Sequence, residues 1–97
     1  MAQLNYEAMM VFSMLPGEEA ITALKERFQA LIEQNGTMTE VKEMGKRRLA
    51  YLINKRESEG YYMLYKFASA PEFPAELERV AGIADGVLRC MVIRLEG

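Results

Sequence analysis

Basic side chains gather in the middle of the chain, around a short polar segment. Six of them lie close together in sequence: Lys42, Lys46, Arg47, Arg48, Lys55 and Arg56. Lysine and arginine at the ends of an extended hairpin can contact nucleic-acid phosphates. A run of charges is also typical of a solvated face, or of an edge strand that charges protect from aggregation. The residues alone leave these interpretations open.

The sequence offers no constellation for catalysis. It has no histidine, which excludes imidazole catalysis, histidine ligation of a metal and activation of Ser13, Ser58 or Ser69. No glycine-rich phosphate loop and no metal-ligand spacing occurs. The single cysteine, Cys90, lies in an alternating apolar run, so we interpret it as a small buried hydrophobe. We therefore expect no enzymatic activity, cofactor, metal or small-molecule substrate.

Length and composition indicate one domain that spans residues 1–97. Hydrophobic residues make up 51% and charged residues 27% of the chain, a balance typical of a packed protein. The net charge of −2 is unusual for a nucleic-acid-binding domain, so any basic surface has to be local. No segment has the ~20 apolar residues of a membrane span, and no secretory signal is visible. The single cysteine excludes an internal disulfide and favours a reducing compartment, so we expect a cytoplasmic protein without membrane contact.

Hydrophobic periodicity predicts six elements. Alternation predicts strands at 4–14, 37–55, 60–69 and 87–95, and spacings of three and four predict helices at 18–34 and 74–82. Gly36 is expected to end the first helix in the left-handed conformation. Glu43 would fall on the core face of the strand 37–55, so we expect a bulge or bend near Gly45.

The order β-α-β-β-α-β predicts an α+β fold. Right-handed crossovers leave room for one strand inside each βαβ unit. The expected result is a four-stranded antiparallel sheet in the order 4-1-3-2, with both helices on one face. Alternation places four residues of the first strand on the core face: Tyr6, Ala8, Met10 and Phe12.

The other face of such a sheet is open, and polar residues are expected there. Several predicted outward residues are apolar instead, and they come from three neighbouring strands: Met9, Val11, Tyr62, Leu64, Met91 and Ile93. An apolar patch from adjacent strands indicates a protein partner. An inverted face in one strand, or a chain terminus over the patch, would explain the same pattern without a partner.

From residue 6 to residue 95 the sequence resembles the family of bacterial small-subunit ribosomal protein number six. The most specific match is the run 45–55, Gly-Lys-Arg-Arg-Leu-Ala-Tyr-Leu-Ile-Asn-Lys, followed by Gly-Tyr-Tyr at 60–62. The Tyr-Glu pair at 6–7, the segment 77–79 and the ending 87–95 also fit. Asn5 and Leu52 depart from the family pattern, since many members have arginine and proline at these positions.

This resemblance implies a ferredoxin-like fold and a structural, non-catalytic role in the ribosome. It further implies binding to the central domain of small-subunit ribosomal RNA, as a heterodimer with small-subunit ribosomal protein number eighteen. The motif Lys46-Arg47-Arg48 carries over as an RNA contact, and Arg89 and Arg94 match basic positions of the last strand. The apolar patch then has a candidate occupant in the partner protein.

Two alternatives stay open. An RNA recognition motif has the same element order, but its third strand starts with a basic residue and presents aromatic side chains on the open face. Here Glu59 replaces the basic residue, and Tyr61 and Tyr65 are expected in the core. A ferredoxin-like protein-interaction or dimerisation module without nucleic acid fits the slightly acidic charge. Phosphate binding weakens steeply with salt, whereas burial of an apolar patch does not, so salt dependence separates these functions.

Overall fold

The structure is a computed structural model that describes residues 3–48 and 59–95. Its elements there are strand β1 (Leu4–Phe12), helix α1 (Glu18–Asn35), strand β2 (Gly36–Arg48), strand β3 (Glu59–Ser69), helix α2 (Phe73–Ile83) and strand β4 (Val87–Arg94). Their order and type are those predicted, and their bounds agree within about two residues except in the second strand. Residues 49–55 of that predicted strand lie outside the described part of the chain.

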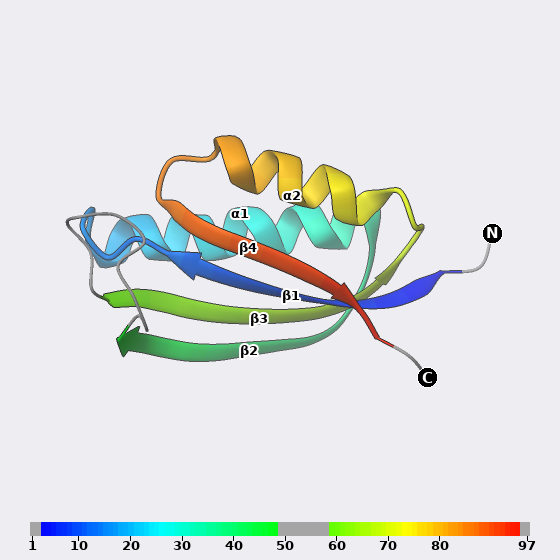
Figure 1. The fold of residues 1–97 in the computed structure, drawn as a ribbon, viewed down its shortest axis with the longest axis horizontal. Coiled ribbons are helices and arrows are strands. Elements are labelled where there is room, and N and C mark those ends of the chain that lie inside the picture. Colours follow the sequence, from blue (N-terminus) through cyan, green and yellow to red (C-terminus); the bar gives the residue numbers. More distant parts are fainter. Residues whose placement is uncertain (1–2, 49–58, 96–97) are drawn as a thin grey trace.

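The strands form one sheet in the order β2-β3-β1-β4, and each pair of neighbours is antiparallel (Figure 1). This is the predicted order read from the opposite edge. α1 connects two strands that flank β3, and α2 connects two strands that flank β1. Both helices cover the same face, so the predicted α+β fold is confirmed and the other face stays open.

The core lies between the helices and the covered face of the sheet. Every second residue of β1 from Tyr6 to Phe12 is buried there, as alternation predicted. α1 contributes buried residues at spacings of three and four: Ile21, Leu24, Phe28 and Ile32. Burial of each large apolar side chain is worth about 1.5–3 kcal/mol relative to exposure. This packing fixes which face of each strand points away from the helices.

Gly36 follows α1 without the predicted left-handed turn. Its φ of −175° and ψ of −158° are extended, and β2 begins at this residue. A Cβ at this position would overlap the backbone carbonyl oxygen of Ala68 on β3. Glycine is therefore required by the close approach of two strands and not by a helix cap, so the predicted conformation was wrong.

Candidate nucleic-acid and protein interface

The open face of the sheet carries the predicted apolar residues. Met9 of β1 pairs with Leu64 of β3 on one side and with Met91 of β4 on the other. The remaining three are Val11, Tyr62 and Ile93. Val11 of β1 pairs with Tyr62, and Glu7, which shares the face of Met9 and Val11, pairs with Ile93. Directly paired residues point to the same face. The structure therefore gathers all six on one face, and we call them the apolar patch.

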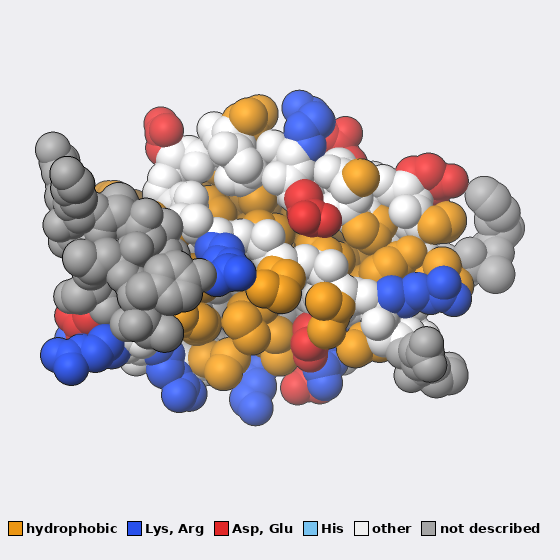
Figure 2. Space-filling view, viewed as in Figure 1, with side chains coloured by type: hydrophobic (Ala, Val, Ile, Leu, Met, Phe, Trp, Pro, Cys, Tyr) orange, Lys and Arg blue, Asp and Glu red, His pale blue; other side chains and the backbone are white. Residues whose placement is uncertain are grey.

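Exposure varies across the apolar patch. Met91 and Ile93, on the outer strand β4, are 44% and 46% exposed, whereas Val11 at the centre is only 3% exposed. A hollow of about 90 Å³ opens over this part of the sheet, lined by Met9, Val11, Tyr62, Arg89 and Met91. Figure 2 shows hydrophobic side chains gathered in the middle of the visible face, below α2. The patch thus combines exposed apolar side chains at its rim with a small recess.

The basic motif at the end of β2 is split between the two faces. Arg47 pairs with Gly60, which shares its face with Tyr62, so Arg47 lies on the open face. Lys46 and Arg48 have the opposite parity and lie on the side of the helices. All three side chains are exposed. The structure therefore does not present the motif as one continuous basic cluster.

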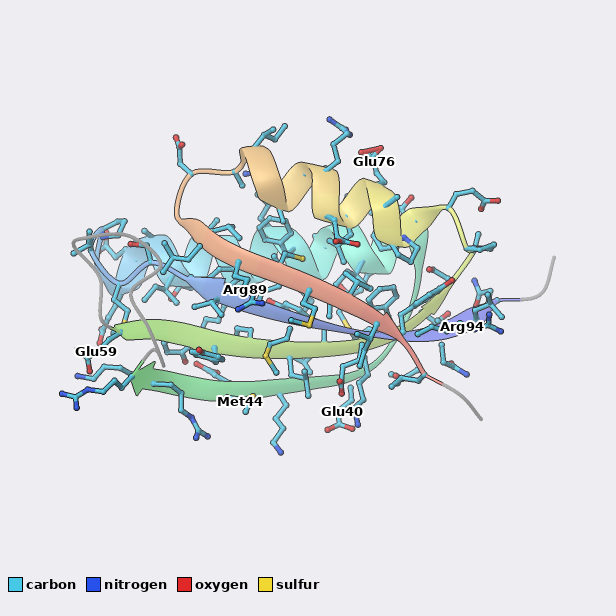
Figure 3. The ribbon with its side chains drawn as sticks, viewed as in Figure 1. Glu40, Met44, Glu59, Glu76, Arg89 and Arg94 are labelled. Atoms are coloured by element: carbon cyan, nitrogen blue, oxygen red, sulfur yellow. The ribbon has the colours of Figure 1, made fainter. Side chains whose placement is uncertain are left out.

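Arg89 and Arg94 both belong to β4 (Figure 3), but the strand pairing places them on different faces of the sheet. They are an odd number of residues apart in a strand whose pairing with β1 is regular between them. Arg89 pairs with Val11 and shares the open face, whereas Arg94 pairs with Tyr6 and shares the covered face. Arg89 is thereby placed beside the apolar patch, and Arg94 is not. Lys55 and Arg56, the other predicted contacts, lie outside the described residues.

The predicted bulge near Gly45 is present. The pairing of β2 with β3 shifts between Glu43 and Gly45, which leaves Met44 as the additional residue. Gly45 has a φ of +81°, a conformation that residues with a Cβ rarely adopt. A second shift occurs between Met38 and Glu40, where no glycine or proline signals it. The sequence therefore predicted one irregularity of β2 and missed the other.

Glu43 remains on the helix-facing side of β2 despite its charge. Its Oε1 accepts a hydrogen bond of 2.8 Å from Nζ of Lys25 on α1. The Lys25 ammonium also lies 5.2 Å from the ring centroid of Tyr61. The carbonyl of Lys25 accepts a hydrogen bond of 3.2 Å from the Tyr65 hydroxyl, whose pKa is raised by burial and by the Glu43 carboxylate. An ion pair at the edge of the core thus accommodates the acid, which the sequence argument had excluded from this face.

The chemistry of the single thiol matches a packing role. Cys90 is half-buried and packs against the core, so it is more exposed than the sequence predicted. Burial, with a smaller effect of the Glu78 carboxylate, raises the pKa of the Cys90 thiol to about 11. Among residues 3–48 and 59–95, no group of three or more His, Cys, Asp or Glu side chains could hold a metal ion. No helix in that part of the chain is long and apolar enough to cross a membrane.

Known proteins resemble this chain over almost its whole length. A family model described as ribosomal protein S6 matches residues 5–94. The small ribosomal subunit protein bS6 of Clostridium novyi is 48% identical over 93 residues, which cover 95% of this chain and 97% of that protein. The protein of the same name from Caldanaerobacter subterraneus is 50% identical over the same shares of both chains. The crystal structure of 30S ribosomal protein S6 from Thermotoga maritima has a TM-score of 0.88 and 29% identity, and the match covers 96% of this chain and 88% of that one.

Proposed function

The chain belongs to the ribosomal protein S6 family, and we propose that it binds the central domain of small-subunit ribosomal RNA together with small-subunit ribosomal protein number eighteen. Family membership makes it a protein of the small subunit of cytoplasmic ribosomes and not an enzyme. The observation that best supports the finer proposal is the open face of the sheet. There an apolar patch extends over β3, β1 and the outer strand β4, and both outer strands, β2 and β4, carry exposed cations.

The apolar patch supports a protein partner. Interface cores are apolar, and their strongest contacts are side chains that fill small pockets. Met91 and Ile93 offer exposed apolar surface, and the hollow of about 90 Å³ beside them has room for one apolar group of the partner. Leu64 lies in the row that joins Met9 and Met91. The proposed partner therefore docks on β3, β1 and β4, across the middle of the open face.

The exposed cations support an RNA contact beside this docking surface. Arg47 on β2 and Arg89 on β4 flank the apolar patch from opposite edges of the sheet. Lys55 and Arg56, which lie outside the described residues, stay in the proposed RNA-binding set, whereas Lys46 and Arg48, which the family resemblance also implies as RNA contacts, lie on the side of the helices. Arg94 points to the other face, so its proposed contact is with a separate part of the RNA. Because the cations are divided between faces, a partner that supplies further phosphate contacts would strengthen RNA binding.

The proposal is tested by titrating a labelled RNA fragment of the small-subunit central domain with this chain. One titration uses the chain alone, and the other uses it with equimolar small-subunit ribosomal protein number eighteen. We expect tight binding only when the partner is present, together with co-elution of the two proteins in gel filtration. Absence of RNA binding under both conditions would contradict the proposal and favour a protein-interaction module.

A further inference from the structure

We infer that Lys42 and Arg47, rather than Lys46 and Arg48, are the side chains of β2 that contact RNA phosphates, and that the bulge at Met44 sets this choice. The inference rests on the proposed function, because it assigns the RNA contact of that same interface to particular residues. Lys42 lies outside the basic motif that the family resemblance emphasised. Its assignment follows from the strand geometry and from the distribution of charge.

The bulge brings Lys42 and Arg47 to one face. They are five residues apart, and in a regular strand an odd separation would place them on opposite faces. Their partners on β3 are Leu64 and Gly60, which are four residues apart and therefore share a face. The extra residue of the bulge on β2 explains why five residues on β2 correspond to four on β3. Both cations thus point to the open side, where the apolar patch also lies.

A neighbouring acid distinguishes Lys46 from Lys42 and Arg47, and Arg48 lies opposite the same acid, Glu59, on the side of the helices. Nζ of Lys46 lies 3.6 Å from Oε2 of Glu59. Lys46 also lines a cavity of about 490 Å³ together with Glu18, Glu43 and Lys25. Lys25 is paired with Glu43, so Glu18 is the carboxylate of this lining that repels phosphate. In the described part of the chain, no ion pair involves Lys42 or Arg47. Glu40 shares the open face with Lys42, but its Oε1 lies 3.8 Å from Nζ of Lys66. A phosphate that approaches the open side therefore meets two cations that form no ion pair with an acid.

Position along the strand suits contact with one RNA backbone. The β3 partners of the two cations, Gly60 and Leu64, are four residues apart, which corresponds to about 13 Å along the strand. The two cations therefore reach different phosphates. Both side chains are exposed, and β2 is an outer strand of the sheet. Figure 2 shows Lys and Arg side chains along the lower edge of the molecule, where β2 runs, below the hydrophobic area. An RNA strand along this edge would leave the apolar patch free for the protein partner.

Two double variants with matched charge test the inference. Lys42→Gln/Arg47→Gln and Lys46→Gln/Arg48→Gln each remove two positive charges from β2. Each variant is measured together with small-subunit ribosomal protein number eighteen, on the central-domain RNA fragment, over a range of salt concentrations. We expect the first variant to bind more weakly and to reduce the slope of log K against log salt by about 1.4–1.8, since each phosphate contact contributes about 0.7–0.9. The second variant should keep the slope of the unaltered protein.

Other outcomes separate the inference from the proposed function. If the unaltered protein with its partner does not bind the RNA, the proposed function fails and the inference fails with it. If the unaltered protein binds but the Lys46→Gln/Arg48→Gln variant loses as much slope as the first variant, or more, only the inference is overturned. A first variant with unchanged affinity and slope would overturn it equally. Native far-UV circular dichroism of both variants is the control for folding.

Discussion

Lys25 of α1 and Glu43 of β2 form an ion pair in which Nζ and Oε1 are 2.8 Å apart. The pair joins the helix layer to the outer strand at the edge of the core, where the two side chains are 23% and 51% exposed. The ring of Tyr61 lies beneath the same ammonium group. This contact explains how the helix-facing side of β2 tolerates an acid, and it keeps Glu43 away from the open face.

The variant Glu43→Gln tests the energetic weight of this ion pair. Because both side chains are partly exposed, solvent screens their attraction, and such pairs typically contribute about 0.2–1 kcal/mol. We expect the free energy of unfolding, measured by urea denaturation, to fall by no more than about 1 kcal/mol. RNA affinity should not fall, since Glu43 faces away from the proposed contact. A loss of stability several times larger would show that the pair is essential for docking α1 on β2.

The variant Gly45→Ala tests the backbone conformation of the bulge. Gly45 has a φ of +81° and open space around the position of a Cβ, so the cost of alanine comes from the backbone alone. We expect a destabilisation of about 1–2 kcal/mol in urea denaturation. Gly82 is the matched control, because it lies in α2 with equally open surroundings and no positive φ. Gly82→Ala should stabilise the protein by about 0.5–1 kcal/mol, and equal effects of the two substitutions would contradict this account.

The variant Leu64→Asp tests the docking of the partner on the apolar patch. A carboxylate in the middle of the patch would have to be desolvated on binding, so we expect co-elution with small-subunit ribosomal protein number eighteen to be lost. Far-UV circular dichroism should remain native, because Leu64 points away from the core. Leu15→Asp serves as the control, since Leu15 is 65% exposed and lies in the loop between β1 and α1. A Leu64→Asp protein that still binds its partner would place the docking surface elsewhere.

The Cys90 thiol makes the free energy of unfolding depend on pH in the alkaline range. Its pKa is about 11 in the folded chain, against about 8.5 for a cysteine in an unfolded chain. Above the lower value the unfolded state loses a proton that the folded state retains. The contribution to stability is therefore complete below pH ~8.5 and is lost as the pH rises through the folded pKa.

We expect the free energy of unfolding to fall between these two pH values, and to fall less in a Cys90→Ala variant. The difference between the two proteins isolates the thiol, because the buried Tyr65 hydroxyl also titrates at high pH and is present in both. Alkylation by iodoacetamide at pH 8.5 should be slower in the native protein than in urea. Equal alkylation rates would contradict the raised pKa.

Periodicity was sufficient to predict the fold and the two faces of β1, β3 and β4. The alternation of Tyr6 and Phe12 with Met9 and Val11 identified the two faces of β1, because burial follows the two-residue period of a strand. Gly36 was misinterpreted because a close strand contact and a helix cap both favour glycine, and only the position of Ala68 distinguishes them. Local spacing thus predicted elements well and contacts between elements less well.

The candidate site was harder to predict, because the position of a charged residue in the sequence does not show on which face of the sheet it lies. Lys46 and Arg47 are adjacent, yet one is paired with Glu59 and the other faces the open side. Lys42 belongs to the basic residues that the sequence offers as phosphate contacts, but only the bulge at Met44 shows that it shares a face with Arg47, since one additional residue reverses the parity of everything beyond it. If one extra residue is assumed near Gly45, alternation along the strand places Lys42 and Arg47 on one face from the sequence alone.

The most direct test of the account is the salt dependence of RNA binding by this chain in complex with small-subunit ribosomal protein number eighteen. If several cations of the interface contact phosphates, log K should fall linearly with log salt, by about 0.7–0.9 for each contact. A steep slope in the complex, together with weak binding by this chain alone, is the predicted result. RNA affinity that does not change between low and high salt would contradict the account, because it would show that phosphates are not what the exposed cations bind.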